Sequence, residues 1–232
     1  MIRDNLLKIN ERISLVCSKI NRDPNEISIV AVTKNRTSGQ IKEAMEAGIA
    51  DIGENRVQEA LFKFNEIAKQ RNDGQRIKWH MVGHLQTNKA KEAVKIFDLI
   101  HSIDSLRLAA EIDKQAAKIN KIQNILIEVK TSQEATKFGL GPDTAAEVIR
   151  ELSGLKNIKV DGLMTIAPLV DNPEKARPYF RMLRELKEKI NELRLTSYEL
   201  RVLSMGMTDD YQVAIEEGST MIRLGRAIFS RQ

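Results

Sequence analysis

Apolar positions along the chain follow two alternating periods, one typical of buried strands and one of amphipathic helices. The run at 27–34, Ile-Ser-Ile-Val-Ala-Val-Thr-Lys, is mostly apolar or β-branched and is followed by turn-forming residues at 35–39. Such a run is typical of an interior strand of a parallel sheet, which is covered on both faces. Over residues 2–20, apolar residues recur at spacings of three and four, which predicts a helix with one buried face.

The same alternation continues along the rest of the chain. Further strands are predicted at 49–53, 77–82, 98–103, 125–129, 160–166, 200–204 and 220–224. Helices are predicted between them at 37–48, 57–67, 89–95, 105–119, 142–152, 173–193 and 209–216. The helix at 37–48 carries the clearest end signals, because Thr37 and Gln40 form a capping-box pair and Gly48 follows its apolar stripe.

Strands that alternate with helices pair in parallel through right-handed crossovers. Eight strands favour a closed barrel, so we predict an α/β fold in which residues 1–232 form one (β/α)8 barrel of the TIM type, without a second β-rich domain. An open, doubly wound sheet is the alternative. Only residues 226–232 follow the last predicted strand, too few for a full helix. We expect the helix at 2–20 to fill that gap, because the two chain ends meet in a closed barrel.

Composition narrows the classes of ligand. The 37 basic and 32 acidic residues are interspersed and leave a net charge of +5, which suits a small anionic ligand. Aromatic residues make up only 4% of the chain, and no basic block is interleaved with them, so we expect no nucleic-acid binding. The single cysteine, Cys17, excludes an internal disulfide. No apolar run is long enough to span a membrane, and we expect a cytoplasmic protein.

In a barrel, the residues at the carboxyl ends of the strands converge on one cavity. Here these residues are Lys34, Asn55, His84, Asp104, Lys130, Met164, Ser204 and Arg223. Two stretches at adjacent strand ends could bind phosphate. One is Ser-Met-Gly-Met-Thr at 204–208, whose backbone N–H groups and hydroxyls could surround an anion. The other is Arg-Leu-Gly-Arg at 223–226, where a glycine allows a ligand to approach the backbone.

A lysine beside a phosphate site suggests imine chemistry. The pKa of a lysine side chain is near 10.4, so about one in 2,500 is neutral and nucleophilic at pH 7. Loss of solvent and a nearby cation such as Arg223 both favour the neutral amine. The residues alone leave open whether Lys34 or Lys130 reacts. They also leave open whether the partner is a sugar-phosphate substrate, as in an aldolase, or pyridoxal phosphate.

His80 and His84 are four residues apart, a spacing that can bind zinc. The pattern falls on and just after a predicted strand rather than on a helix, and the glutamate that follows the first histidine in many zinc proteases is missing. We therefore predict core or loop histidines and no metal site.

Seven stretches, in order along nearly the whole chain, resemble the pyridoxal phosphate homeostasis proteins, which look like the barrel domain of bacterial alanine racemase standing alone. The stretches are AVTK at 31–34, GENRVQE at 53–59, WHMVGHLQTNK at 79–89, HSIDS at 101–105, GLMT at 162–165, SMGMT at 204–208 and RLG at 223–225. Two positions depart from the family pattern. Lys130 stands where many members have asparagine, and Ser230 stands where glycine is common.

The resemblance implies that Lys34 carries pyridoxal phosphate as an aldimine and that Arg223 faces the pyridine nitrogen. A permanently charged guanidinium there would keep that nitrogen unprotonated and weaken the cofactor as an electron sink. The implied phosphate contacts are Ser204, Gly206, Met207 and Thr208, with Gly225 and Arg226 acting through backbone N–H groups. The implied pocket walls are Asn55, His80 and Met164.

The resemblance also bears on catalysis. Alanine racemase uses the cofactor lysine and a tyrosine from a second domain as its two bases, whereas this sequence ends seven residues after Gly225. Tyr179, Tyr198 and Tyr211 all fall in or beside predicted helices. We therefore expect a monomeric, non-catalytic protein that holds pyridoxal phosphate, maintains vitamin B6 homeostasis and hands the cofactor to apoenzymes. The alternatives are a racemase of low activity and a Schiff-base sugar-phosphate aldolase.

Overall fold

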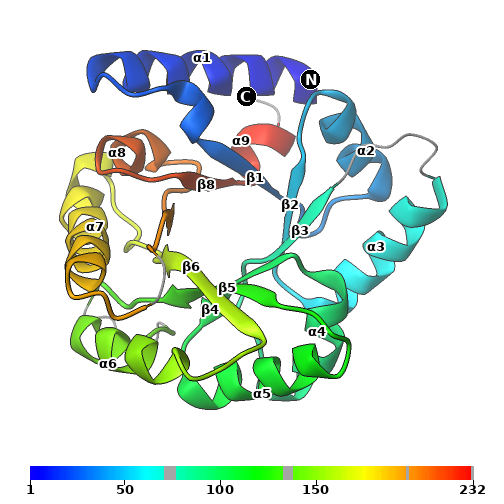
Figure 1. The fold of residues 1–232 in the computed structure, drawn as a ribbon. Coiled ribbons are helices and arrows are strands. Elements are labelled where there is room, and N and C mark those ends of the chain that lie inside the picture. Colours follow the sequence, from blue (N-terminus) through cyan, green and yellow to red (C-terminus); the bar gives the residue numbers. More distant parts are fainter. Residues whose placement is uncertain (71–76, 133–137, 197–198, 231–232) are drawn as a thin grey trace.

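The computed structural model of the chain describes residues 1–70, 77–132, 138–196 and 199–230. Within these ranges the strands form a closed barrel, in which each strand pairs in parallel with the next (Figure 1). The strands are β1 (Ser28–Val32), β2 (Asp51–Glu54), β3 (Lys78–Met81), β4 (Leu99–Ile103), β5 (Gln123–Glu128), β6 (Ile158–Met164), β7 (Val202–Ser204) and β8 (Met221–Leu224). Ser28 pairs with Met221, which closes the ring and confirms the predicted barrel.

Helices surround the barrel as an outer layer (Figure 1). They are α1 (Ile2–Lys19), α2 (Ser38–Glu46), α3 (Val57–Gln70), α4 (Ala90–Ile96), α5 (Leu106–Ala117), α6 (Pro142–Leu152), α7 (Arg177–Glu192), α8 (Tyr211–Glu216) and α9 (Arg226–Phe229). Short 3-10 helices lie at Pro24–Glu26, Thr87–Lys89 and Pro173–Ala176. None of the helices in the described ranges has the length and apolar character needed to cross a membrane.

Helix α1 fills the gap left by the short α9, as the sequence predicts. It packs against α8, α9 and α2, and α9 lies beside α1 in Figure 1. The side-chain amide of Asn5 donates hydrogen bonds to the carbonyl oxygens of Ile228 at 2.9 Å and Ser230 at 3.0 Å. These two bonds fasten the start of the chain to its last helix.

The capping residues predicted for the ends of α2 and α5 are confirmed. Thr37 and Gln40 form a reciprocal capping box at the start of α2, and Gly48 adopts a φ of 105° after its end. Only glycine reaches this conformation without strain. The hydroxyl of Ser105 accepts a hydrogen bond from the amide of Leu108 and so caps α5.

Most element boundaries lie within three residues of the predicted ones, as in β6, which is Ile158–Met164 rather than 160–166. Three differences can be examined further. The single helix expected at 173–193 is a 3-10 turn followed by α7, because Pro178 has no N–H group to continue one hydrogen-bond ladder through both. Strand β5 begins at Gln123, two residues before the predicted start, because a polar glutamine interrupts the apolar pattern from which strands are predicted. The side-chain amide of Gln123 donates a hydrogen bond to the carbonyl oxygen of Asp98. Helix α9 was not predicted.

Apolar side chains form two cores. The larger lies between the strands and the helices, and Phe180 and Leu183 on α7 are fully buried in it. Burial of each such side chain contributes about 1.5–3 kcal/mol. The smaller core lies among the strands and consists of Val30, Val82, Leu99, Leu126, Met164 and Met221.

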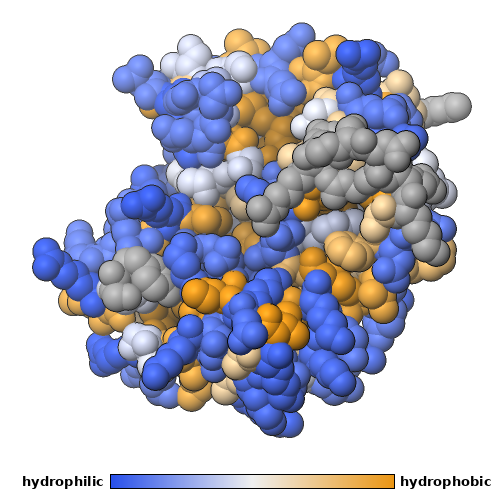
Figure 2. All heavy atoms as spheres, turned by 45° about the vertical axis from the view of Figure 1, so that its right-hand side comes forward, coloured by the Kyte–Doolittle hydropathy of each residue, from blue (hydrophilic) through white to orange (hydrophobic). Residues whose placement is uncertain are grey.

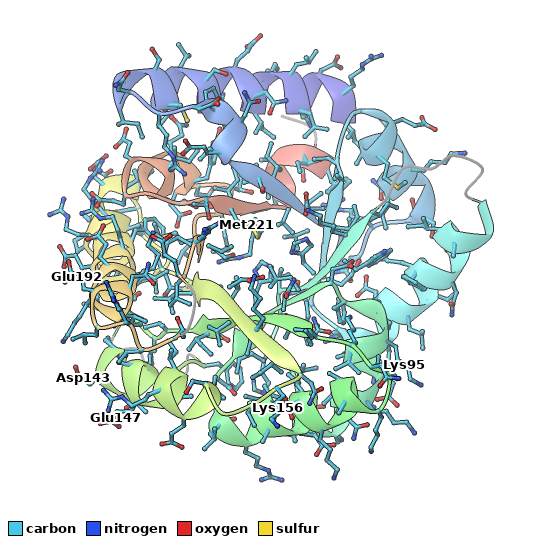
Figure 3. All side chains as sticks on the ribbon, viewed as in Figure 1. Lys95, Asp143, Glu147, Lys156, Glu192 and Met221 are labelled. Atoms are coloured by element: carbon cyan, nitrogen blue, oxygen red, sulfur yellow. The ribbon has the colours of Figure 1, made fainter. Side chains whose placement is uncertain are left out.

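Most charged residues lie around the outside of the molecule. In Figure 3, Lys95, Glu147 and Glu192 lie on the outer layer, whereas Met221 lies at the ring of strands. Hydrophilic side chains also predominate on the face in Figure 2, with hydrophobic ones between them. The polar residues enclosed by the barrel therefore stand out as candidates for function.

Candidate functional site

A cavity of about 860 Å³ opens at the carboxyl ends of β1, β2 and β8. Seven of the predicted site residues line it: Lys34, Asn55, Met207, Thr208, Arg223, Gly225 and Arg226. The loop after β6, at 166–171, forms another wall. A second cavity, of about 490 Å³, shares Lys34 and Asn55 with the first and is also lined by Arg56 and Lys89. Lys34 therefore stands between two cavities.

The backbone on both sides of Lys34 is held by a buried group of charges. The ammonium of Lys63 donates to the carbonyl oxygen of Thr33 at 2.5 Å and to the carboxylate of Glu54 at 2.6 Å. The hydroxyl of Thr33 also donates to Glu54. Glu54 and Lys63 are nearly inaccessible to solvent, and burial raises the pKa of Glu54 although Lys63 and Thr33 oppose the change.

Glu59 completes this group on the other side of Lys34. Its carboxylate accepts hydrogen bonds from the ammonium of Lys63 at 2.7 Å and from the backbone amide of Asn35 at 2.9 Å. Asn35 has a φ of 58°, a left-handed conformation that asparagine tolerates better than most residues. The cluster thus fixes where the exposed Lys34 side chain leaves the barrel.

Asn55 supplies a polar atom that lacks a partner. Its side-chain oxygen is buried and accepts no hydrogen bond, although the residue lines both cavities. A buried acceptor without a partner costs about 1–3 kcal/mol. A ligand with a donor at this point would remove that cost.

The turn after β7 is tightly constrained. Gly206 has a φ of 93°, and a Cβ atom there would lie 2.6 Å from the Cβ of Ala214 and 2.9 Å from the Cα of Tyr211. Its carbonyl oxygen accepts from the amide of Arg223 at 3.0 Å. The hydroxyl of Thr208 accepts from the amide of Ala227 at 3.3 Å, so this turn and the start of α9 form one unit.

Three carboxylates also line the main cavity, and each has a partner. Asp209 is paired with Arg226, and Asp171 with Lys175. Asp210 accepts from the amide of Met207 at 2.6 Å, and burial raises its pKa. These contacts reduce the repulsion that an anionic ligand would meet.

Arg223 is the buried cation of the main cavity, with 4% of its surface exposed. Its guanidinium donates to the hydroxyl of Ser204 at 2.7 Å and to the carbonyl oxygen of Thr165 at 2.8 Å. Burial lowers its pKa to about 10, although Glu128 and Asp210 act in the opposite direction. The guanidinium therefore remains charged at neutral pH.

Glu128, the last residue of β5, is a second buried charge near Arg223. Burial and the negative charge of Asp104 raise its pKa to about 7, and Arg223 partly opposes this. Its protonation consequently changes in the physiological range. Sequence analysis missed this residue, and the only available signal is a charged residue at the end of an apolar run.

Four predicted site residues do not line the main cavity: His80, Met164, Ser204 and Gly206. His80 is enclosed by the barrel and contacts Asp51 and His101, and Met164 belongs to the inner core. Ser204 reaches the cavity indirectly, through Arg223.

Lys130 also lies outside the lining of both cavities, so of the two candidate lysines only Lys34 lines them. His84 is paired with Asp104 at 3.2 Å and stacks on Phe138 with ring centroids 3.8 Å apart. Across the described ranges, no group of three or more histidine, cysteine or acidic side chains is arranged to hold a metal ion.

A protein-family match and a curated relative both cover nearly the whole chain. The alanine racemase N-terminal domain family matches residues 5–231. The pyridoxal phosphate homeostasis protein of Aquifex aeolicus is 42% identical over 99% of this chain and 97% of its own length.

Solved structures agree with this relationship. PipY of Synechococcus elongatus PCC7942, solved with PLP (pyridoxal phosphate) bound, superposes with a TM-score of 0.84 at 33% identity, over 99% of this chain and all of its own. Alanine racemase of Clostridium difficile 630 has a TM-score of 0.77 at 15% identity, over all of this chain and 59% of its own, which reflects a shared fold. The chain belongs to the family of pyridoxal phosphate homeostasis proteins.

Proposed function

We propose that residues 1–232 form one pyridoxal phosphate-binding barrel that holds the cofactor covalently through Lys34 and serves vitamin B6 homeostasis. The observation that carries this proposal is the convergence of Lys34, the buried Arg223 and residues Met207 and Thr208 of the turn after β7 on one cavity of about 860 Å³. The cofactor supplies an aldehyde that forms a Schiff base with an amine. The PLP-bound relative supports the same ligand here.

The residues present fit this cofactor. Thr208 offers a hydroxyl, and Gly225 and Arg226 offer backbone N–H groups at the start of α9, where the first helical N–H groups have no acceptor within the helix. These donors suit a phosphate. Asn55 lines both cavities together with Lys34, and its unpaired oxygen would gain a partner from a ligand that donates a hydrogen bond. Ser204 and Gly206 act behind this surface, through Arg223 and the shape of the turn.

Arg223 determines how strongly the cofactor could activate a substrate. We propose that its guanidinium would face the pyridine nitrogen of the bound cofactor. Because a guanidinium only donates hydrogen bonds, it keeps that nitrogen unprotonated and weakens electron withdrawal into the ring. This favours storage of the cofactor over turnover.

The distribution of tyrosines also favours a non-catalytic role. No tyrosine of the described residues lines either cavity that contains Lys34; Tyr211 is buried in α8, and Tyr198 lies outside the described residues. A second base must come within hydrogen-bond reach of its proton. Steady turnover of D- or L-alanine above the rate of free pyridoxal phosphate would contradict this part of the proposal.

We further propose a cytoplasmic monomer that hands the cofactor to apoenzymes. One chain supplies all the residues assigned to the cofactor. Transfer to an apoenzyme faster than spontaneous release tests the hand-over, and light scattering of the purified protein tests the monomer.

An absorbance titration with pyridoxal phosphate tests the binding proposal. The wild type should develop the absorbance of a protein-bound imine, and Lys34→Ala should not. Lys130→Ala is the matched control, because Lys130 follows strand β5 but lies outside the lining of both cavities. Equal loss of the signal in both variants, or a protein that traps only sugar phosphates, would overturn the assignment.

A further inference from the structure

A continuous chain of hydrogen-bonded side chains runs through the barrel and ends at Arg223. The carboxylate of Asp51 lies 2.9 Å from Nε2 of His80, and Nδ1 of His80 lies 2.9 Å from Nε2 of His101. Nδ1 of His101 lies 2.9 Å from the hydroxyl oxygen of Ser204, which accepts from Arg223 at 2.7 Å. We call these five residues, which come from β2, β3, β4, β7 and β8, the relay.

The two ends of the relay face different cavities. Arg223 lines the main cavity at the carboxyl ends of the strands. Asp51, the first residue of β2, lines a small cavity of about 210 Å³ that also contacts Leu6 of α1 and Gly48. Between them, His80, His101 and Ser204 are at most 2% exposed. The relay therefore connects the cofactor cavity with the opposite end of the barrel.

The chemistry of the relay defines one direction for its hydrogen bonds. Arg223 can only donate, so Ser204 accepts from it and donates its own proton to Nδ1 of His101. Burial, followed by the interactions with His80 and Arg223, holds the pKa of His101 well below its usual value, so this ring is neutral. Because Nδ1 accepts from Ser204, its one proton lies on Nε2. That proton is donated to Nδ1 of His80.

The last link ends on a carboxylate. With Nδ1 accepting, the proton of His80 lies on Nε2 and is donated to Asp51. The polar side-chain hydrogens of Ser204, His101 and His80 then all have acceptors. In the reverse order, the hydroxyl proton of Ser204 would have no acceptor within the relay, and a buried donor without a partner costs about 1–3 kcal/mol.

We propose that Asp51, His80, His101 and Ser204 are positioning residues for Arg223, through which the carboxylate at one end of the barrel fixes the orientation of the guanidinium in the cofactor cavity. Each ring orients the next because its tautomer is set by its neighbour. The expected effect of these residues on cofactor affinity rests on the proposed function. The hydrogen-bond order itself is independent of the cofactor.

The first test is ¹⁵N NMR of the histidine and arginine side chains in cofactor-free protein. We expect both His80 and His101 as Nε2–H tautomers, and we expect Asp51→Ala to shift the ring signals of both and the Nη signals of Arg223. Asp161→Ala is the matched control, because Asp161 also lies on a barrel strand and its side chain is 19% exposed against 17% for Asp51. An Nδ1–H tautomer at His101, or Arg223 signals unchanged in Asp51→Ala, would overturn the proposal.

The second test compares pyridoxal phosphate affinity and the absorbance maximum of the bound cofactor. Asp51→Ala should bind about tenfold more weakly with a shifted maximum, and Asp51→Asn, which keeps an acceptor oxygen for His80, should restore most of both. Wild-type affinity and spectrum in Asp51→Ala would contradict the positioning role. If the wild type fails to bind pyridoxal phosphate while the NMR signals of Arg223 respond to Asp51→Ala, the proposed function fails and the positioning role stands.

Discussion

The ammonium of Lys63 lies 2.5 Å from the carbonyl oxygen of Thr33, the residue directly before Lys34. The same ammonium neutralises the buried carboxylate of Glu54. A helix side chain thus holds the strand end from which Lys34, the lysine proposed to bind the cofactor, projects. The position of Lys34 depends on this buried ion pair as well as on the barrel.

Removing the ammonium of Lys63 should destabilise the folded protein. We expect Lys63→Met to lower the free energy of unfolding by about 3–5 kcal/mol, because the carboxylate of Glu54 is left buried without its partner. Urea denaturation measures the change. Lys42→Met, at an exposed position of α2, is the control and should stay within about 0.5 kcal/mol of the wild type. A loss no larger than that of the control would show that the ion pair does not stabilise the fold.

Glu128 predicts a pH dependence of stability. Its pKa is about 7 in the folded protein against 4.5 as the ordinary value, so the folded state binds a proton more tightly than the unfolded state. The free energy of unfolding should therefore fall as pH rises from about 4.5 to about 7, by on the order of 3 kcal/mol, and then level off.

Glu128→Gln should remove this dependence, because the amide cannot ionise. Denaturation curves at pH 5, 6, 7 and 8 give the profile. Glu147→Gln, on the exposed face of α6 (Figure 3), should keep the wild-type slope. If Glu128→Gln and the wild type have parallel profiles, Glu128 is not the group that titrates.

The turn after β7 should be intolerant of any side chain at its glycine. Gly206→Ala places a Cβ 2.6 Å from the Cβ of Ala214 at a φ of 93°. We expect it to destabilise the fold by more than about 1–3 kcal/mol and to weaken pyridoxal phosphate binding, because the turn must move. Calorimetry and a binding titration measure both effects.

Gly218→Ala is the matched control for that variant. Gly218 has the same φ of 93°, but its nearest neighbour would be the Cδ of Arg184 at 3.4 Å. It should show the cost of backbone strain alone, with unchanged cofactor affinity. Equal effects of the two substitutions on affinity would contradict a specific role for the turn.

Local patterns were sufficient to predict the barrel. Short, mainly apolar runs that end at turn residues locate all eight strands, and apolar stripes locate the helices between them. Boundaries shift where a local sequence feature acts, as at Pro178 in the first turn of α7, which lacks the N–H group that would join this helix to the preceding 3-10 turn. The cover provided by α1 follows from barrel closure, which brings Asn5 to the last helix.

The site was predicted only in part. Lys34, Arg223 and the 204–208 turn follow from their places at strand ends and from the family resemblance. The cluster around Lys63 and the relay do not, because their contacts join residues distant in sequence, such as His101 and Ser204, which are 103 positions apart. A single sequence gives the spacing within an element but not which interior side chains meet across the barrel.

Mass spectrometry of protein incubated with pyridoxal phosphate, reduced with borohydride and digested tests the central claim most directly. The claim is that Lys34 forms the covalent link to the cofactor. We predict a pyridoxyl group on the peptide that contains Lys34. A pyridoxyl group on Lys130 or another lysine in its place, or no stoichiometric label, would contradict it.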